Sequence, residues 1–433
     1  MEHILFVDMT QAGIHVLRRA VERGHAVTFI RGAAASYYHP DAAFFELLSR
    51  LDKVIDIPDT ADADILAAAI ERVHAGRRVD AVIGHYDPTF EALATACQRF
   101  RLPFASPEGV TNVRDKSRTR ALIAQAGLAS ARYTVVDDRS RVRELAAAVG
   151  YPAVVKPVGG IDSVFARQVD GLAAAQDAVD AILHASAAPN TPLKIRRLID
   201  RGIIIEEYVA GELVSAEIAL NGDQCWPFLI CGRSRGRLDD CVEVGAVLPA
   251  PMSTEQARDC FDYAEAVCRA VDLTFGVFHV EMLVTDHGPV LVEINPRAMG
   301  GVMAPMYKTL TGTDFCDYIL DLHLGRKLRP TPLDSTTRTI TSRRLMSARS
   351  ATVPPDVDVA WATGSDSGLV SFESFLLKPG TVVGERDLLG RFVVEGQTWS
   401  EAMHTANDLL KRFEKDIGLP LIEPQPIEGA PCR

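Results

Sequence analysis

Blocks of apolar residues separated by amphipathic stretches dominate the first part of the chain. Residues 4–7 are all apolar, and a loop with Gly13 leads into apolar positions 14, 17 and 21 at helical spacing. Gly24 and a second apolar run follow, so the pattern predicts a strand, a helix and a strand in succession. The lone Gly13 does not complete a Gly-x-Gly-x-x-Gly fingerprint, and a dinucleotide site is therefore not favoured here.

The alternation continues with a predicted strand at 53–57, a helix at 64–74, a strand at 79–84 and a helix at 89–100. Strands that alternate with helices favour an open parallel sheet, because parallel neighbours need a crossover connection. We therefore expect residues 1–110 to form an N-terminal parallel α/β domain.

The middle of the chain, residues 111–325, mixes helical and strand periodicity. An irregular stretch is expected around Arg233, Arg235 and Arg237. The other predicted elements are helices at 115–127, 171–185, 254–271 and 314–324, a strand at 153–157, and two strands each around Ala210-Gly211 and at 276–297.

The composition changes near residue 330. Residues 335–420 are predicted to form strands and one helix at 400–415, and the proline-rich tail from Pro420 is expected to be extended. At about 150 residues per domain, 433 residues correspond to about three domains. We therefore place a C-terminal α+β domain at 326–433.

Charge and composition narrow the function classes. The formal net charge is -11, and 24% of residues are charged, as in ordinary globular proteins. Since phosphate-backbone binding needs a clustered Lys/Arg excess, we expect no nucleic-acid partner. The apolar runs are too short for a signal peptide or a membrane span, so a soluble cytoplasmic protein without a membrane partner is expected. The eight cysteines show no zinc spacing and are expected to be reduced.

The hairpin at 276–297 carries the clearest chemistry. Period-two alternation places Leu291, Glu293 and Asn295 on one face of its second strand. On the first strand, Glu281 shares a face with His279. If the loop is the three residues 286–288, Glu281 falls directly opposite Glu293.

Two carboxylates in that position have Cβ atoms only about 5 Å apart and repel each other, so a cation is expected between them. Glu281, Glu293 and the amide oxygen of Asn295 form an all-oxygen set, which suits Mg²⁺, with Mn²⁺ as an alternative metal. Two other readings stay open. One glutamate faces solvent, or the loop has two residues and the register shifts by one.

Cationic residues and glycines accompany this hairpin. Arg297 follows it after a proline, and a guanidinium there can neutralise charge on a phosphoryl group or an oxyanion. Gly300 and Gly301 let a small ligand approach the backbone. Lys116 and Lys156 stand at segment boundaries and are candidate phosphate contacts, although each alone would be an ordinary surface residue.

A run of isoleucines ends at Glu206 and Glu207, and Val209 and Glu212 follow. The exposed backbone of such a strand end could hydrogen-bond an adenine while an acid takes ribose hydroxyls. A hairpin with solvated glutamates explains the pattern equally well.

Taken in order, five motifs resemble those of the ATP-grasp superfamily: RDK at 114–116, VVKP at 154–157, IEEYVAGE at 205–212, HVEM at 279–282 and VEINPR at 292–297. The resemblance covers about 110–325 and implies a two-lobed ATP-grasp fold of α+β subdomains, with a lid subdomain at about 130–208. The preceding domain resembles the one that usually precedes this fold. The C-terminal residues resemble, more weakly, the extra domain of L-amino-acid ligases.

The resemblance implies a role for each matching position. Lys156 and Arg297 would be catalytic. The remaining roles are ATP-phosphate contacts from Lys116 and Lys156, an adenine hinge from Glu206, Glu207 and Val209, a ribose contact from Glu212, Mg²⁺ ligands from Glu281, Glu293 and Asn295, and substrate contacts from Glu243, Arg297, Gly300 and Gly301.

Two stretches depart from the pattern of the resemblance. Amino-acid ligases commonly show E-x-G-H, whereas residues 243–246 keep the acid Glu243 and end in Ala246. The phosphate-covering loop usually reads like G-S-x-G, and at 159–165 only Ser163 and the glycines could act in this way. Amine specificity and lid closure are therefore not settled by the sequence.

The expected reaction is ATP-dependent activation of a small carboxylic acid as an acyl phosphate, followed by attack of an amine and release of ADP and phosphate. His279 is one candidate base, although a buried strand histidine near a metal is more often structural. A carboxylase or purine-pathway enzyme, and a nucleotide-binding protein without turnover, are the alternatives. A homodimer is the expected assembly.

Overall fold

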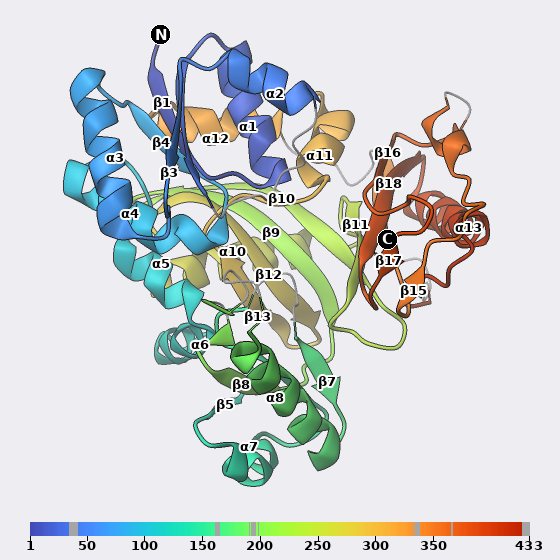
Figure 1. Ribbon diagram of the computed structural model, residues 1–433. Helices are drawn as coiled ribbons and strands as arrows, with labels where there is room; N and C mark the ends of the chain where they lie inside the picture. The colour runs from blue at the N-terminus through green and yellow to red at the C-terminus, as the bar shows by residue number, and fades with distance from the viewer. Residues whose placement is uncertain are drawn as a thin grey trace.

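The computed structural model places an N-terminal α/β layer on one side of a long central sheet and a separate lobe on the other (Figure 1). The C-terminal residues lie at one end of this sheet. Among the described residues, every helix is too short or too polar to cross a lipid bilayer. The described residues are 1–33, 42–160, 165–189, 191, 196–197, 199–331, 333, 338–364 and 367–426.

The N-terminal layer is a parallel sheet, as the sequence predicts. Its strand order is β3-β2-β1-β4. β1 is buried along its whole length, and Thr10 caps the helix that follows by accepting a hydrogen bond from the Gly13 N–H. The elements are β1 (His3–Val7), α1 (Gln11–Glu22), β2 (Ala26–Gly32), α2 (Ala42–Ser49), β3 (Lys53–Ile57), α3 (Ala63–Gly76), β4 (Ala81–Gly84), η1 (Asp87–Thr89) and α4 (Phe90–Phe100).

The lobe on the other side of the central sheet, which we call the lid lobe, is an antiparallel sheet with order β5-β8-β6-β7. Apolar residues of its strands pack against two helices in one buried cluster. Two helices, α5 (Pro107–Arg114) and α6 (Lys116–Gln125), lead into it. Its elements are β5 (Tyr133–Val136), η2 (Arg139–Arg141), α7 (Val142–Val149), β6 (Ala153–Pro157), β7 (Arg167–Val169), α8 (Leu172–Ala187) and β8 (Ile203–Glu207).

The central sheet has eight strands in the order β13-β12-β9-β10-β11-β14-β18-β16. Its last three strands come from the C-terminal residues, so that part of the chain extends the sheet through the β11–β14 pair. The strands are β9 (Glu212–Asn221), β10 (Gln224–Arg235), β11 (Glu243–Leu248), β12 (Phe275–Thr285), β13 (Gly288–Asn295), β14 (Thr339–Met346), β16 (Ser371–Ser374) and β18 (Leu388–Gly396).

Helices cover the central sheet. α10 begins at a capping box formed by Ser253 and Gln256, and its apolar face packs on β9 and β13. The remaining elements are α10 (Thr254–Ala270), α11 (Met303–Thr311), α12 (Phe315–His323), β15 (Ala351–Thr352), η3 (Ala360–Thr363), β17 (Val382–Val383) and α13 (Trp399–Ile417).

Two sequence predictions for the middle of the chain are wrong. The strands on either side of Gly211 form no hairpin, because β8 belongs to the lid lobe and β9 to the central sheet. At the crossing the backbone runs so close to β12 that a Cβ on Gly211 would lie 2.7 Å from the Val284 carbonyl oxygen. Arg233 and Arg235 lie within β10, not in an irregular stretch, and their charged side chains face acids of the site.

The β12–β13 hairpin confirms the predicted pairing of Glu281 with Glu293, but the predicted loop length is wrong. Its loop has two residues, since Thr285 pairs with Gly288 and not with a residue beyond it. A bulge then adds one residue to β13 between Leu291 and Glu293, and Glu281 again lies opposite Glu293. Because of the bulge, Leu291 packs in the same core as Ile294 and does not share the face of Glu293.

Candidate functional site

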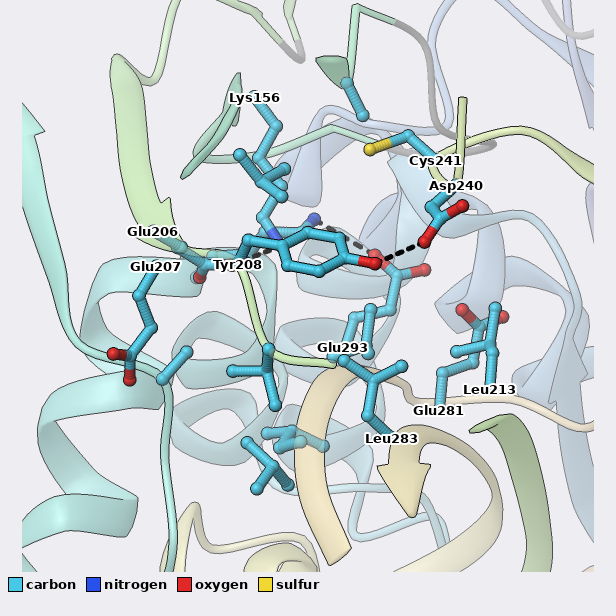
Figure 2. A pocket seen from close by; sticks show the side chains of 18 of the residues that line it. Lys156, Glu206, Glu207, Tyr208, Leu213, Asp240, Cys241, Glu281, Leu283 and Glu293 are labelled. Atoms are coloured by element: carbon cyan, nitrogen blue, oxygen red, sulfur yellow. Dashed lines mark hydrogen bonds and ion pairs between the residues drawn. The ribbon is translucent and has the colours of Figure 1, made fainter. Parts of the chain in front are cut away.

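A narrow cavity of about 150 Å³ lies between the lid lobe and the central sheet. We call it the first cavity. Its walls are largely apolar and its floor carries charged groups from both sides (Figure 2). The apolar lining comes from Ala131, Val154, Val209, Leu213, Leu283, Val290 and Leu291.

Two lysines reach the floor of the first cavity from opposite elements. Lys156 stands on β6, and its Nζ lies 2.6 Å from Glu206 Oε2 on the adjacent strand β8. Lys116 begins α6, and its Nζ lies 3.2 Å from Glu293 Oε2 and donates to the Gly160 carbonyl oxygen at 2.8 Å. Burial lowers the pKa of Lys116, although Glu293 partly opposes this effect. The structure therefore brings together two positive charges that the sequence places 40 residues apart by number.

Arg120 completes this charge network and was missed by the sequence reasoning. Its side chain is 1% exposed, and its Nε donates to Glu206 Oε1 at 2.9 Å. Its Nη2 donates to the carbonyl oxygen of the bulge residue Val292 at 2.8 Å. Burial alone would raise the pKa of Glu206, but Arg120 and Lys156 outweigh it and lower this pKa to about 2. The helical i, i+4 spacing of Lys116 and Arg120 was the available signal.

The predicted hinge residues Glu206, Glu207 and Val209 all line the first cavity. Glu207 turns outward to Arg132, while the main chain from Glu206 to Val209 passes along the cavity wall. Glu212 is exposed and is absent from the lining, where its neighbour Leu213 stands. Glu212, the predicted ribose contact, therefore lies outside the lining of this cavity.

The predicted metal ligands converge at one end of the first cavity. Glu281 and Glu293 lie opposite each other, and Asn295 Nδ2 donates to Glu293 Oε1 at 3.2 Å. Burial would raise the pKa of Glu293, but Lys116 and Lys156 hold it below its ordinary value. The set therefore presents an ionised carboxylate and further hard oxygen donors, which fits Mg²⁺.

A second, more polar cavity of about 470 Å³ adjoins the first one. We call it the second cavity. Four residues line both: Cys241, Glu243, Glu281 and Glu293. The predicted metal ligands therefore stand where the cavities meet. The second cavity is lined also by Ala246, Asn295, Arg297, Gly300, Gly301, Met303, Arg344, Met346, Arg386 and Arg391.

Arg297 is held by a residue of the N-terminal layer. Its Nε donates to Asp87 Oδ2 at 2.7 Å, and Arg114 Nη1 lies 3.9 Å from the other oxygen. Asp87 is buried, which alone would raise its pKa, but these two arginines hold the pKa below its ordinary value. No sequence pattern marks Asp87, because it stands 210 positions from Arg297.

Glu243 is gripped by two arginines at the edge of the second cavity. Its Oε1 lies 2.9 Å from Arg233 Nη1 and 3.0 Å from Arg344 Nη2. Burial would raise its pKa, but both guanidinium groups hold it below its ordinary value. Ala246, which takes the place of the expected histidine, is buried and lines the cavity without a polar group.

His279 lies between two carboxylates and does not suit a free base. Its Nδ1 contacts the fully buried Glu217, and its Nε2 lies 3.0 Å from Glu281 Oε1. Burial alone would lower its pKa, but the carboxylates raise this pKa to about 9. Glu217, on β9, also accepts a hydrogen bond from the Met299 N–H at 3.0 Å and so connects β9 to the segment after Arg297. Sequence reasoning missed Glu217.

The predicted phosphate loop lies partly outside the described residues. Gly160 lines the first cavity, and Phe165 lines the second. Ser163 falls in the gap between them. Its role is not described by the structure.

Two known domain families match the chain. The ATP-grasp domain matches residues 149–306, and the ATP-grasp N-terminal domain matches residues 17–104. The matched regions contain the opposed carboxylates Glu281 and Glu293 as well as Arg297 and Asp87, whereas Lys116 lies between the two regions.

Two curated relatives show the same likeness. The uncharacterized protein y4rH of Sinorhizobium fredii is 26% identical over 324 residues, which cover 70% of this chain and 64% of that protein. Carnosine synthase 1 of Gallus gallus is 27% identical over 257 residues, which cover 58% of this chain and 28% of that protein. The chain thus spans less than two thirds of either relative.

A solved structure, the L-amino acid ligase from Bacillus licheniformis, has a similar fold over nearly the whole length. The TM-score is 0.75 at 17% identity, with 96% of this chain and 98% of that chain covered. The match includes the C-terminal residues that extend the central sheet.

Proposed function

We propose, starting from the membership of this chain in the ATP-grasp superfamily, that it is an ATP-dependent ligase that joins a carboxylic acid to an amine. One observation carries the proposal. The opposed carboxylates Glu281 and Glu293 stand where a narrow apolar cavity meets a larger polar one. This arrangement suits the transfer of a phosphoryl group from a nucleotide in the first cavity to an acid in the second.

The first cavity supports ATP binding on both steric and electrostatic grounds. Apolar side chains can enclose a purine ring, and the main chain at 206–209 can hydrogen-bond its edge. Lys116 and Lys156 stand toward the central site, where they can bind the phosphates. Their present partners are the carboxylates of Glu293 and Glu206.

Glu281, Glu293 and Asn295 would hold Mg²⁺ in this proposal. An ion held there would supply positive charge to offset the charge on the phosphate oxygens during transfer. The observation that supports the fit is chemical: the set offers only oxygen donors to a cation, and Lys116 already lies against one of its carboxylates.

The proposed reaction has two displacement steps. A carboxylate oxygen of the acid attacks the γ-phosphorus, and the bond to the β-phosphate oxygen breaks to release ADP. The amine nitrogen then attacks the acyl carbon and loses a proton, and the bond to phosphate breaks to give the amide and phosphate. In this proposal Arg297, which Asp87 holds by a hydrogen bond, would stabilise the oxyanion of the second step.

The second cavity supports polar substrates of small size. Glu243 can bind an ammonium group, because its charge is held ionised by two arginines. The names of the relatives agree with such substrates, since carnosine synthase and L-amino acid ligase both denote peptide-forming enzymes.

The test is release of ADP and phosphate from the purified protein with Mg-ATP, measured against pools of amino acids, carboxylic acids and bicarbonate, with mass detection of condensed products. Release that requires both an acid and an amine, and that disappears in Glu293→Gln, is expected. The matched control Glu71→Gln changes an exposed glutamate on α3. Release stimulated by bicarbonate alone would contradict the proposal, and ATP binding without turnover in any pool would assign the chain to the non-catalytic alternative.

A further inference from the structure

The loop between β10 and β11, residues 236–242, forms one wall of the first cavity, and we call it the roof loop. Asp240 and Cys241 line the first cavity, and Cys241 and Val242 line the second. In Figure 2, a dashed line joins Asp240 to Tyr208, and Cys241 lies beside Asp240. The roof loop therefore touches both compartments of the site.

Asp240 joins the roof loop to the hinge. Its Oδ2 accepts hydrogen bonds from the Tyr208 hydroxyl group and from Arg235 Nη1, the second at 3.2 Å (Figure 2). Arg235 Nη2 also donates to the Gly211 carbonyl oxygen at 2.9 Å. Since Tyr208 lies between Glu207 and Val209, Asp240 restrains the stretch of main chain that borders the first cavity.

The C-terminal segment, residues 421–426, grips the same roof loop from outside. Gln425 Nε2 donates to Asp240 Oδ1, and the Gln425 N–H donates to the Arg235 carbonyl oxygen at 2.8 Å. The Arg237 N–H donates to the Glu423 carbonyl oxygen at 2.9 Å. Both carboxylate oxygens of Asp240 are thus occupied, one by the hinge side and one by the C-terminal segment.

The C-terminal segment is itself anchored to the C-terminal part of the fold. Leu421 is buried, and its N–H donates to Glu414 Oε2 on α13 at 3.0 Å. The Ile422 N–H donates to the Met346 carbonyl oxygen on β14 at 2.9 Å. A rigid support therefore stands behind the contacts that Gln425 makes with Asp240.

We propose that the C-terminal segment is a positioning element of the nucleotide site: Gln425 fixes Asp240, and Asp240 fixes Tyr208 of the hinge. Among the described residues, the hydrogen bonds of Gln425 reach the site only through the roof loop and its flank Arg235, and both border the first cavity. The one hydrogen bond of the segment to a lining residue of the second cavity, from Ile422 to Met346, lies outside residues 423–426. Residues 423–426 are therefore expected to act on ATP affinity and not on the chemical steps. This inference rests on the proposed binding of ATP in the first cavity.

The experiment measures the dissociation constant for Mg-ATP, the KM for ATP, kcat and the melting temperature in Tyr208→Phe, Gln425→Ala, their combination, and a truncation that removes residues 423–433. The matched control truncation removes 427–433 and keeps the contacts of 423–426. Leu421 and its buried contacts stay in both truncated proteins.

Each single variant and the longer truncation are expected to weaken ATP binding about fivefold, the effect of one hydrogen bond, while kcat at saturating ATP stays within about twofold. Both substitutions act through Asp240. The dissociation constant of the combined variant for Mg-ATP should therefore be no more than about twofold higher than that of the single variant with the lower ATP affinity. The control truncation should bind ATP like the full chain.

Two results overturn the inference. One is wild-type ATP affinity in Gln425→Ala and in the longer truncation, including the case in which only the melting temperature falls. The other is a loss of ATP affinity in the combined variant that equals the product of the losses in the two single variants. Absence of ATP binding in the full chain would instead contradict the proposed function, so the two failures are distinguishable.

Discussion

The two cavities of the site are built in different ways. The charged floor of the first cavity comes from four motifs, and most of its ion pairs join residues of the predicted ATP-grasp region. The charged residues that line the second cavity come from the central sheet and the C-terminal strands, as Glu243 and Arg344 show, and its Arg297 is held by Asp87 of the N-terminal layer. The charged groups of the first cavity thus come from one predicted domain, although their partners lie far apart in the sequence. The charged groups of the second cavity and their supports come from three parts of the chain.

The largest expected loss of activity follows a substitution at the junction of the two cavities, and it should therefore affect both of them. Glu293→Gln removes one charge from the opposed pair and from the partner of Lys116. We expect kcat to fall about 1000-fold, as is usual when transition-state charge loses its stabilisation. Steady-state ADP release measures this effect, and an unchanged circular dichroism spectrum excludes misfolding. Activity within about tenfold of wild type would contradict the metal assignment.

The next effect tests the first cavity alone through its pH dependence. The pKa of Glu206 is lowered from 4.5 to about 2, so the unfolded chain binds more protons than the folded one between these values. Its contribution to stability, about 3 kcal/mol, is fully present above pH 4.5 and is lost as the pH falls through 2.

Urea unfolding between pH 3 and pH 7 checks this expectation. The difference in unfolding free energy between the wild type and Glu206→Gln should be largest above pH 4.5 and should shrink as the pH falls. A difference that is constant over this range would show that the carboxylate does not titrate as expected. Glu71→Gln is again the control, because its side chain is exposed.

A smaller effect separates the two cavities. Asp87→Asn removes the charged anchor of Arg297, and we expect kcat to fall about 30-fold because a misplaced catalytic group loses its orientation. The dissociation constant for Mg-ATP should stay within about twofold, since Asp87 does not line the first cavity. Equal losses in ATP affinity and turnover would show that the cavities are not independent.

The smallest effect concerns the far side of the second cavity. Arg344→Gln removes one of the two guanidinium groups that hold Glu243, and we expect the KM of the organic substrate bound there to rise about fivefold. The KM for ATP should not change. A titration of both substrates measures the split, and a rise confined to ATP would contradict the assignment of the second cavity.

The sequence predicted the parts that depend on local periodicity. The N-terminal parallel sheet and the pairing of Glu281 with Glu293 are confirmed. The pairing survived because a shorter loop and a bulge shift the register in opposite senses, which alternation alone does not reveal. The hairpin around Gly211 was wrong, because two strands adjacent in sequence entered different sheets.

The residues that sequence reasoning missed share one property. Each of them contacts a partner from a distant segment, and short-range spacing in the sequence does not predict such a contact. These residues are Arg120, Glu217 and Asp87. The roles of the site residues, and the expected homodimer, stay predictions. Sedimentation of the purified protein would measure the assembly.

The hydrogen bond between Asp87 and Arg297 has a consequence for how such a protein can evolve. The Arg297 guanidinium takes its orientation from a layer that, among the described residues, contributes nothing to the lining of the second cavity. An exchange of that layer between relatives would carry over a usable enzyme only if the incoming layer brought an acid to the same place. If Arg297 has the proposed role, inheritance of the N-terminal layer and of the segment that carries Arg297 is linked, even though they lie far apart along the chain.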